Sequence, residues 1–112
     1  MIIHHNPRCS KSRQALALLK ENGVEPEVVE YLKTPLDEAA LRGLLTKLGL
    51  KAHDILRTKE DECKQLGLSP DTPEEEILAA IVQHPILLER PIIVKGNRAI
   101  IGRPPENVRE LL

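Results

Sequence analysis

The first 31 residues alternate between strand-like and helix-like patterns, and this alternation constrains the fold more than any other feature of the chain. Residues 1–4 form a short apolar strand pattern, residues 12–22 place alanine and leucine at helical spacing, and residues 27–31 contain adjacent β-branched valines. Gly23 is a natural stop after the helix. These residues predict a β-α-β unit. Its first loop lies at the carboxyl end of a strand, where open α/β sheets bind ligands.

The middle of the chain, at about residues 36–84, is predicted to be helical. Thr34 and Thr72 each stand before a proline and an acidic residue, a pattern that caps the first turn of a helix. Two apolar faces at helical spacing follow, made of Leu41, Leu44, Leu45 and Leu48 and of Ile77, Leu78, Ile81 and Val82. Residues 54–67, between these two helices, are expected to form one or two short helical turns.

The end of the chain returns to strand-like patterns. Residues 92–94 and 99–101 are apolar runs on either side of Gly96 and Asn97, which predicts a β-hairpin. A last helix is expected to start near Pro104. The element order is therefore β-α-β, then helices, then β-β-α. We predict an α/β, thioredoxin-like fold with a helical insertion after the second strand, in a single domain over residues 1–112.

Composition narrows the classes of protein to which this chain can belong. Hydrophobic residues make up 41% and charged residues 29%, which is typical of a globular protein, and Tyr31 is the only aromatic residue, so aliphatic side chains must fill the core. The formal net charge of −1 disfavours binding to nucleic acid. No apolar run approaches the ~20 residues that span a bilayer. The start of the chain is too short and too polar for a signal peptide. We therefore expect a cytoplasmic protein that binds neither membrane nor nucleic acid.

Cys9 lies between the first strand and the first helix, and this position predicts a reactive thiol. The free N–H groups and the dipole of a helix N-terminus favour an anion and lower the pKa of a cysteine placed there. Arg8, Lys11 and Arg13 add positive charge nearby. His5 lies at the end of the strand, where it can hydrogen-bond or pair with the thiolate. Free cysteines are often small buried hydrophobic residues instead, but these polar and cationic neighbours favour a nucleophile.

The residue three positions after Cys9 is Ser12, so the loop is Cys-x-x-Ser and not the Cys-x-x-Cys of a dithiol redox motif. A substrate attacked by Cys9 must then be resolved by an external thiol or by Cys63. Acidic residues surround Cys63 and oppose a thiolate, so we expect it to be a half-buried structural residue on a short helix. No spacing of histidine, cysteine and acidic residues resembles a metal site, and no metal is expected.

Three arginines, Arg57, Arg90 and Arg103, stand at the ends of predicted elements and are candidates for binding an oxyanion. The planar fork of donors on arginine suits tetrahedral anions. In a thioredoxin-type sheet the proline that starts the third strand, here Pro91, lies beside the cysteine loop, commonly after a cis peptide bond. That position would place Arg90 next to Cys9. Taken singly, each of these arginines is better explained as a solvated or salt-bridged side chain.

The loop sequence HNPRCSKSR, at residues 5–13, resembles the active-site loop of the glutaredoxin-linked arsenate reductase family. The resemblance continues in the same order through EYLKTP (30–35), LR (56–57), QLGL (65–68), ERPI (89–92) and GRP (102–104). It covers essentially the whole chain. The family has a thioredoxin-like fold with a helical insertion, which agrees with the element order predicted above.

The resemblance implies a role for each matching residue. Cys9 is expected to be the nucleophile that attacks arsenate, and His5 is expected to help keep that cysteine ionised. The residues expected to bind arsenate and stabilise the later adducts are Arg57, Arg90 and Arg103.

The resemblance also implies the partners of the reaction and the supports of the site. Glutathione is expected as a co-substrate and glutaredoxin as the partner that clears the mixed disulfide, with no bound cofactor. Pro91 is expected to follow a cis peptide bond, and Asn6 and Ser12 are expected to support the site structurally.

The loop departs from the better-known members of the family, which carry Gly-Thr where this chain has Ser10 and Lys11. This difference concerns the affinity for the oxyanion or the choice of oxyanion, not the fold. The phosphatase-like arsenate reductases, with a Cys-x5-Arg loop, are excluded because the sixth residue after Cys9 is Ala15. Two alternatives remain open. One is a regulator of the same fold family that binds RNA polymerase, and the other is a monothiol oxidoreductase that acts on another substrate.

Overall fold

The computed structural model describes residues 1–112, which form two compact units. The first unit consists of residues 1–34 and 90–112, and the second consists of residues 35–89. The segment predicted to be a helical insertion, residues 36–84, lies inside the second unit. The chain therefore leaves the first unit after its second strand and returns to it just before the third.

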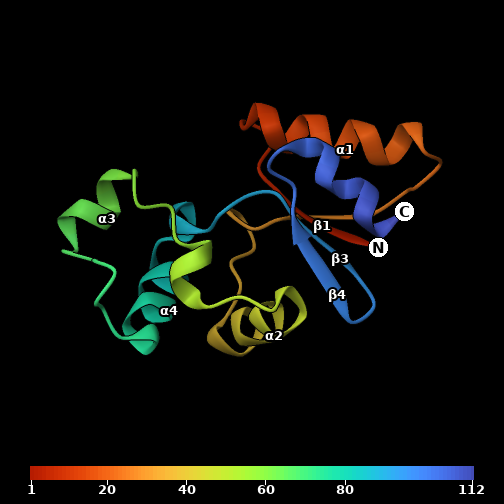
Figure 1. Ribbon diagram of the computed structural model, residues 1–112. Coiled ribbons are helices and arrows are strands. Elements are labelled where there is room, and N and C mark those ends of the chain that lie inside the picture. Colours follow the sequence, from red (N-terminus) through yellow and green to blue (C-terminus); the bar gives the residue numbers. More distant parts are fainter. The chain divides into compact units, whose positions relative to one another are not determined.

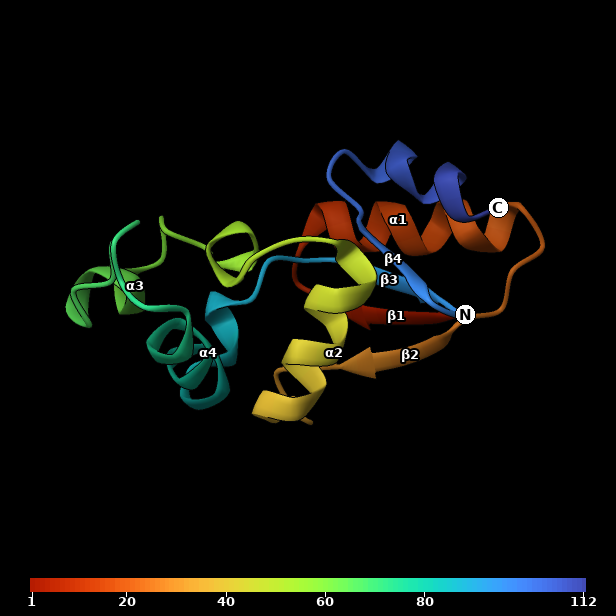
Figure 2. The same cartoon turned by 60° about the horizontal axis from the view of Figure 1, so that its bottom comes forward.

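The first unit is built on a four-stranded mixed sheet in the order β2-β1-β3-β4 (Figure 2). The strands are β1 (Ile2–His5), β2 (Glu27–Glu30), β3 (Ile92–Lys95) and β4 (Arg98–Ile101). β1 and β2 are parallel, whereas β3 pairs antiparallel with both β1 and β4. The predicted β-α-β unit and the predicted hairpin are both confirmed. Gly96, in the hairpin turn, has a φ of +59°, a backbone conformation that glycine adopts at little cost.

Helix α1 (Ser10–Glu21) and the 3₁₀ helix η3 (Pro105–Leu111) pack beside each other on one face of this sheet (Figures 1 and 2). The core between them and the sheet is aliphatic, as the composition requires, and is formed by Ile3, Ala15, Leu19, Ile93, Val108 and Leu111. The last element is a 3₁₀ helix because its backbone N–H groups bond three residues back, as from Asn107 to the carbonyl of Pro104. This packing anchors the start of α1, and with it the cysteine loop, on the sheet.

The second unit is helical, as predicted. Its elements are α2 (Glu38–Leu48), η1 (Ala52–Ile55), α3 (Asp61–Gln65), α4 (Glu74–Gln83) and η2 (Pro85–Leu87). α4 packs against α2, η1 and η2, and a single antiparallel bridge joins Leu56 to Leu88. None of the helices in the chain has the length and apolar character needed to span a membrane.

The predicted helix starts need correction. α2 is capped by Asp37, whose carboxylate accepts a hydrogen bond from the backbone N–H of Ala40 at 2.8 Å, so Thr34 lies outside the helix. At α4 the N-cap is Pro73, and the Thr72 hydroxyl instead accepts a hydrogen bond from the backbone N–H of Ser69. Thr34 is therefore not the cap of α2, because the Asp37 carboxylate lies nearer to the first turn. Thr72 is not the cap of α4, because its hydroxyl closes the preceding turn.

Candidate active site

The backbone places Cys9 at the N-cap of α1. The helix begins at Ser10, two residues before the start at residue 12 that the apolar spacing predicted. The N–H of Cys9 donates to the carbonyl of Asn6 at 3.0 Å and closes a four-residue turn, and the Cys9 carbonyl accepts from the N–H of Arg13 at 3.0 Å. The Asn6 side chain accepts from the N–H of Arg8, and Arg13 donates to the carbonyl of Pro7. The loop is thus held by its own hydrogen bonds, with the cysteine at the positive end of the helix.

The surroundings of the Cys9 sulfur favour its thiolate. Partial burial acts to raise the pKa of Cys9, but hydrogen bonds from the backbone N–H of Ser12, the Arg90 side chain and the backbone N–H of Lys11 outweigh it. The positive charge of Arg90 acts in the same direction. The pKa of Cys9 therefore lies below the ordinary thiol value, as expected for a cysteine at a helix N-terminus beside cations.

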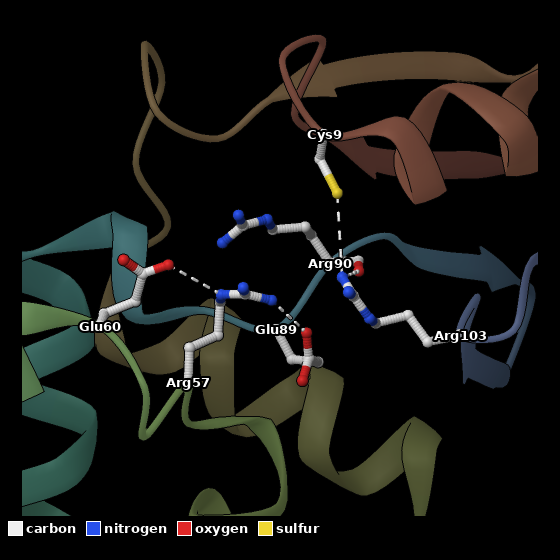
Figure 3. A network of polar contacts seen from close by, with 6 residues as sticks. All are labelled: Cys9, Arg57, Glu60, Glu89, Arg90 and Arg103. Atoms are coloured by element: carbon white, nitrogen blue, oxygen red, sulfur yellow. Dashed lines mark hydrogen bonds and ion pairs between the residues drawn. The ribbon is translucent and has the colours of Figure 1, made fainter.

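The β3–β4 hairpin brings Arg103 beside the Cys9 sulfur. Its Nη1 lies 3.8 Å from the Cys9 sulfur and 3.2 Å from the carbonyl oxygen of Arg90, and it donates to both (Figure 3). The Arg90–Pro91 peptide bond is cis, as the resemblance implied. Two of the three predicted arginines, one before β3 and one after β4 at the open end of the hairpin, therefore converge on the cysteine.

Gly102 supports this arrangement, and the sequence reasoning assigned it no role. A Cβ atom at this position would stand 2.8 Å from Cγ of Pro91 and 3.0 Å from Cδ1 of Ile93. Its N–H donates to the carbonyl of Pro91 at 2.8 Å. Only glycine allows this close approach, which aligns Arg103 with the start of β3. The one sequence signal was its place directly before Arg103.

His5 and Ser12 form a buried polar pair. Oγ of Ser12 and Nδ1 of His5 are 2.6 Å apart and share a hydrogen bond, and the same hydroxyl accepts from the N–H of Asn6 at 3.1 Å. Burial lowers the pKa of His5 and outweighs the Glu30 carboxylate, which acts to raise it, so the ring is neutral at neutral pH. The expected bond of His5 to Cys9 is thus replaced by one to Ser12. His5 is therefore linked to the Cys9 sulfur only through Ser12, whose backbone N–H donates a hydrogen bond to that sulfur.

Arg57 lies in the second unit, where two carboxylates hold its guanidinium. Nη1 donates to Oε1 of Glu89 at 2.8 Å, and Nε donates to Oε1 of Glu60 at 3.2 Å (Figure 3). Burial acts to lower the pKa of Arg57, but the bonds and charges of Glu60 and Glu89 raise it. Arg57 is thus a salt-bridged side chain, the alternative that the sequence analysis gave for each arginine taken singly. The role of Arg57 in substrate binding stays a prediction.

Cys63 is more deeply placed than expected. It lies on α3 and is 3% exposed, so the prediction of a half-buried residue is wrong. The short helix buries the side chain of Cys63, whereas its neighbours Asp61 and Lys64 are exposed. No group of three or more histidine, cysteine or acidic side chains is placed to hold a metal ion.

The fold and the site together define a thioredoxin-like α/β protein with one cysteine at the N-terminus of its first helix and arginines beside the sulfur. The sequence matches the ArsC family over residues 4–111, and the chain belongs to this family.

Similar proteins agree with this assignment over nearly the full length. A Neisseria meningitidis serogroup A protein named "Arsenate reductase" is 50% identical over 112 residues, which cover 98% of this chain and 96% of the relative. An Escherichia coli (strain K12) relative, "Uncharacterized protein YfgD", is 56% identical over 112 residues, with 98% and 94% covered. The solved structure of an arsenate reductase from Vibrio cholerae has a TM-score of 0.95 at 43% identity and covers 99% of this chain and 96% of its own.

Proposed function

We propose that this protein reduces arsenate to arsenite, with glutathione as the thiol donor. Glutaredoxin is the partner that removes glutathione from Cys9 and so regenerates the enzyme. The observation that carries this proposal is a cysteine of lowered pKa at a helix N-terminus, with Nη1 of Arg103 3.8 Å from its sulfur. Relatives named arsenate reductase at 50% and 43% identity support the choice of substrate. Glutathione and glutaredoxin act in a reducing compartment, so the proposal includes a cytoplasmic location.

In the first step the Cys9 thiolate attacks As(V). A sulfur–arsenic bond forms, and one arsenate oxygen leaves as hydroxide or water. Negative charge shifts onto the remaining oxygens, where cationic donors and helix N–H groups stabilise it. Arg90 and Arg103 are the side chains beside the sulfur that supply such donors.

In the second step a glutathione thiolate attacks the Cys9 sulfur. A disulfide forms, the sulfur–arsenic bond breaks, and its electron pair stays on arsenic, which leaves as arsenite. Two electrons have then moved from two thiols to As(V). Glutaredoxin takes the glutathionyl group in a thiol–disulfide exchange, which restores the Cys9 thiol.

An external donor suits the residues around Cys9. Ser12 stands where a dithiol enzyme has its second cysteine, and its hydroxyl is engaged with His5 and the N–H of Asn6. Cys63 is 3% exposed within the second unit, which opposes its use as a thiolate. The second reducing thiol is therefore expected to come from outside the chain.

The test is a coupled assay in which arsenate, glutathione, glutaredoxin and glutathione reductase are present and NADPH oxidation is followed. We expect turnover that disappears in Cys9→Ser and persists in Cys63→Ala, with circular dichroism showing that both variants fold. Full turnover in Cys9→Ser would rule out Cys9 as the nucleophile. No turnover by the folded wild-type protein would refute the reduction of arsenate with glutathione and glutaredoxin as proposed.

A further inference from the structure

A cavity of about 280 Å³ lies in the first unit, beside the cysteine loop. It is lined by residues 5–8 of the loop and by Glu30, Leu32 and Lys33, which follow the end of β2. β1 and β2 are parallel neighbours, and His5 is paired in register with Glu30. The cavity therefore lies at the carboxyl ends of two adjacent parallel strands, the edge at which α/β sheets bind ligands.

The charges of this cavity suit a small peptide with two carboxylates and one ammonium group. Arg8 and Lys33 supply two cations and Glu30 supplies one anion. Lys33 Nζ lies 3.5 Å from Oε1 of Glu30, with the two side chains 78% and 38% exposed. An exposed pair of this kind contributes little stability, so a ligand can replace it. Leu32, 38% exposed, adds an apolar surface for an aliphatic stem.

The cavity is lined by the loop residues that lead directly into Cys9. The turn from Asn6 to Cys9 is closed by a hydrogen bond from the N–H of Cys9 to the carbonyl of Asn6. In such turns the first and last Cα atoms are less than about 7 Å apart. An extended tripeptide spans about 10 Å. A tripeptide held in this cavity is therefore long enough to reach from Asn6, which lines the cavity, to Cys9 at the other end of the turn.

We propose that this cavity is the binding site of the thiol donor, with Arg8 and Lys33 pairing the two carboxylates of glutathione and Glu30 pairing its α-ammonium. The inference rests on the proposed function, because it assigns a site to the donor of that reaction. The bound thiolate forms the disulfide with Cys9 while arsenic keeps the electron pair of the broken sulfur–arsenic bond. The segment Glu30–Lys33, which the proposed chemistry otherwise leaves without a role, becomes the element that recognises the donor.

The first test measures binding without reaction. S-methylglutathione, whose sulfur is blocked, is titrated into ¹⁵N-labelled protein. We expect chemical-shift changes at the amides of Arg8, Leu32 and Lys33, and a dissociation constant that Lys33→Glu raises by roughly tenfold, the effect of losing a hydrogen bond to a charged group. The matched control is Lys47→Glu, the same charge change on the exposed side of α2. Shifts elsewhere, no shifts at millimolar analogue, or equal affinities of the two variants would overturn the site.

The second test separates this inference from the proposed function. The ratio of kcat/KM for glutathione to kcat/KM for 2-mercaptoethanol, an uncharged thiol, is measured with saturating arsenate. We expect Lys33→Glu to lower this ratio roughly tenfold and Lys47→Glu to leave it as in the wild type. An unchanged ratio in Lys33→Glu would refute the site while arsenate reduction stands. Binding of S-methylglutathione at the cavity by a protein without arsenate turnover would refute the reaction while the site stands.

Discussion

Gly102→Ala is the substitution for which the structure predicts an effect most directly. The new Cβ would stand 2.8 Å from Cγ of Pro91 and 3.0 Å from Cδ1 of Ile93. Ile93 can turn the end of its side chain, but the proline ring is fixed to the backbone, so the hairpin or the start of β3 must shift. Overpacking of this kind costs about 1–3 kcal/mol. We therefore expect the free energy of unfolding to fall by that amount.

The same shift should disturb the active site. The residue after Gly102 is Arg103, whose Nη1 donates to the Cys9 sulfur and to the carbonyl of Arg90. Movement of a few tenths of an ångström weakens both contacts, so we expect the KM for arsenate to rise and kcat to fall together. Urea unfolding measures the change in the free energy of unfolding, and the coupled arsenate assay measures the changes in KM and kcat.

Gly43→Ala is the matched control, because the same methyl group is added inside α2, where no atom beyond the neighbouring backbone of the helix lies within 4 Å of the new atom. Alanine favours a helix over glycine, so this variant should be more stable by about 0.5–1 kcal/mol, with unchanged kinetics. If Gly102→Ala were as stable as Gly43→Ala and fully active, the close approach of the hairpin to Pro91 would not support the site in the way described.

Three further predictions concern the thiolate and its supports. Because the pKa of Cys9 lies below the ordinary thiol value, its alkylation by iodoacetamide should stay fast as the pH falls below the pKa of free cysteine. Arg90→Ala should move this pH profile of the alkylation rate to higher pH. An unmoved profile would contradict the role given to Arg90. Ser12→Ala removes the partner of buried His5 and should lower the free energy of unfolding by about 1–3 kcal/mol in urea titration. Arg103→Ala should raise the KM for arsenate roughly tenfold, and an unchanged KM would exclude Arg103 from oxyanion binding.

Local patterns were enough to predict most of the elements. The apolar spacing of residues 12–22 and the turn at Gly96 act over a few residues, so they can be found without knowing the fold. The position of Cys9 between a strand and a helix was predicted in the same way, and with it the lowered pKa. The helix caps were less predictable, because Asp37 and Thr34 compete for the same role and the outcome depends on the path of the preceding chain.

The contacts between distant residues could not be derived from local patterns. Arg103 reaches Cys9 only because the β3–β4 hairpin turns the chain back, and Gly102 matters only because Pro91 is packed against it. The acids around Cys63 predicted a half-buried residue, yet its side chain is 3% exposed. Spacing alone therefore could not decide whether these residues belong to a site.

The sequence by itself determined the order of the elements, the aliphatic core and the position of Cys9 at a helix N-terminus, since hydrophobic periodicity and helix-terminal electrostatics act within a few residues. The tertiary structure decided which arginines meet the sulfur, that His5 bonds Ser12, and that a charged cavity opens between the ends of β1 and β2. These depend on the register and pairing of the strands, which bring together side chains far apart in the sequence.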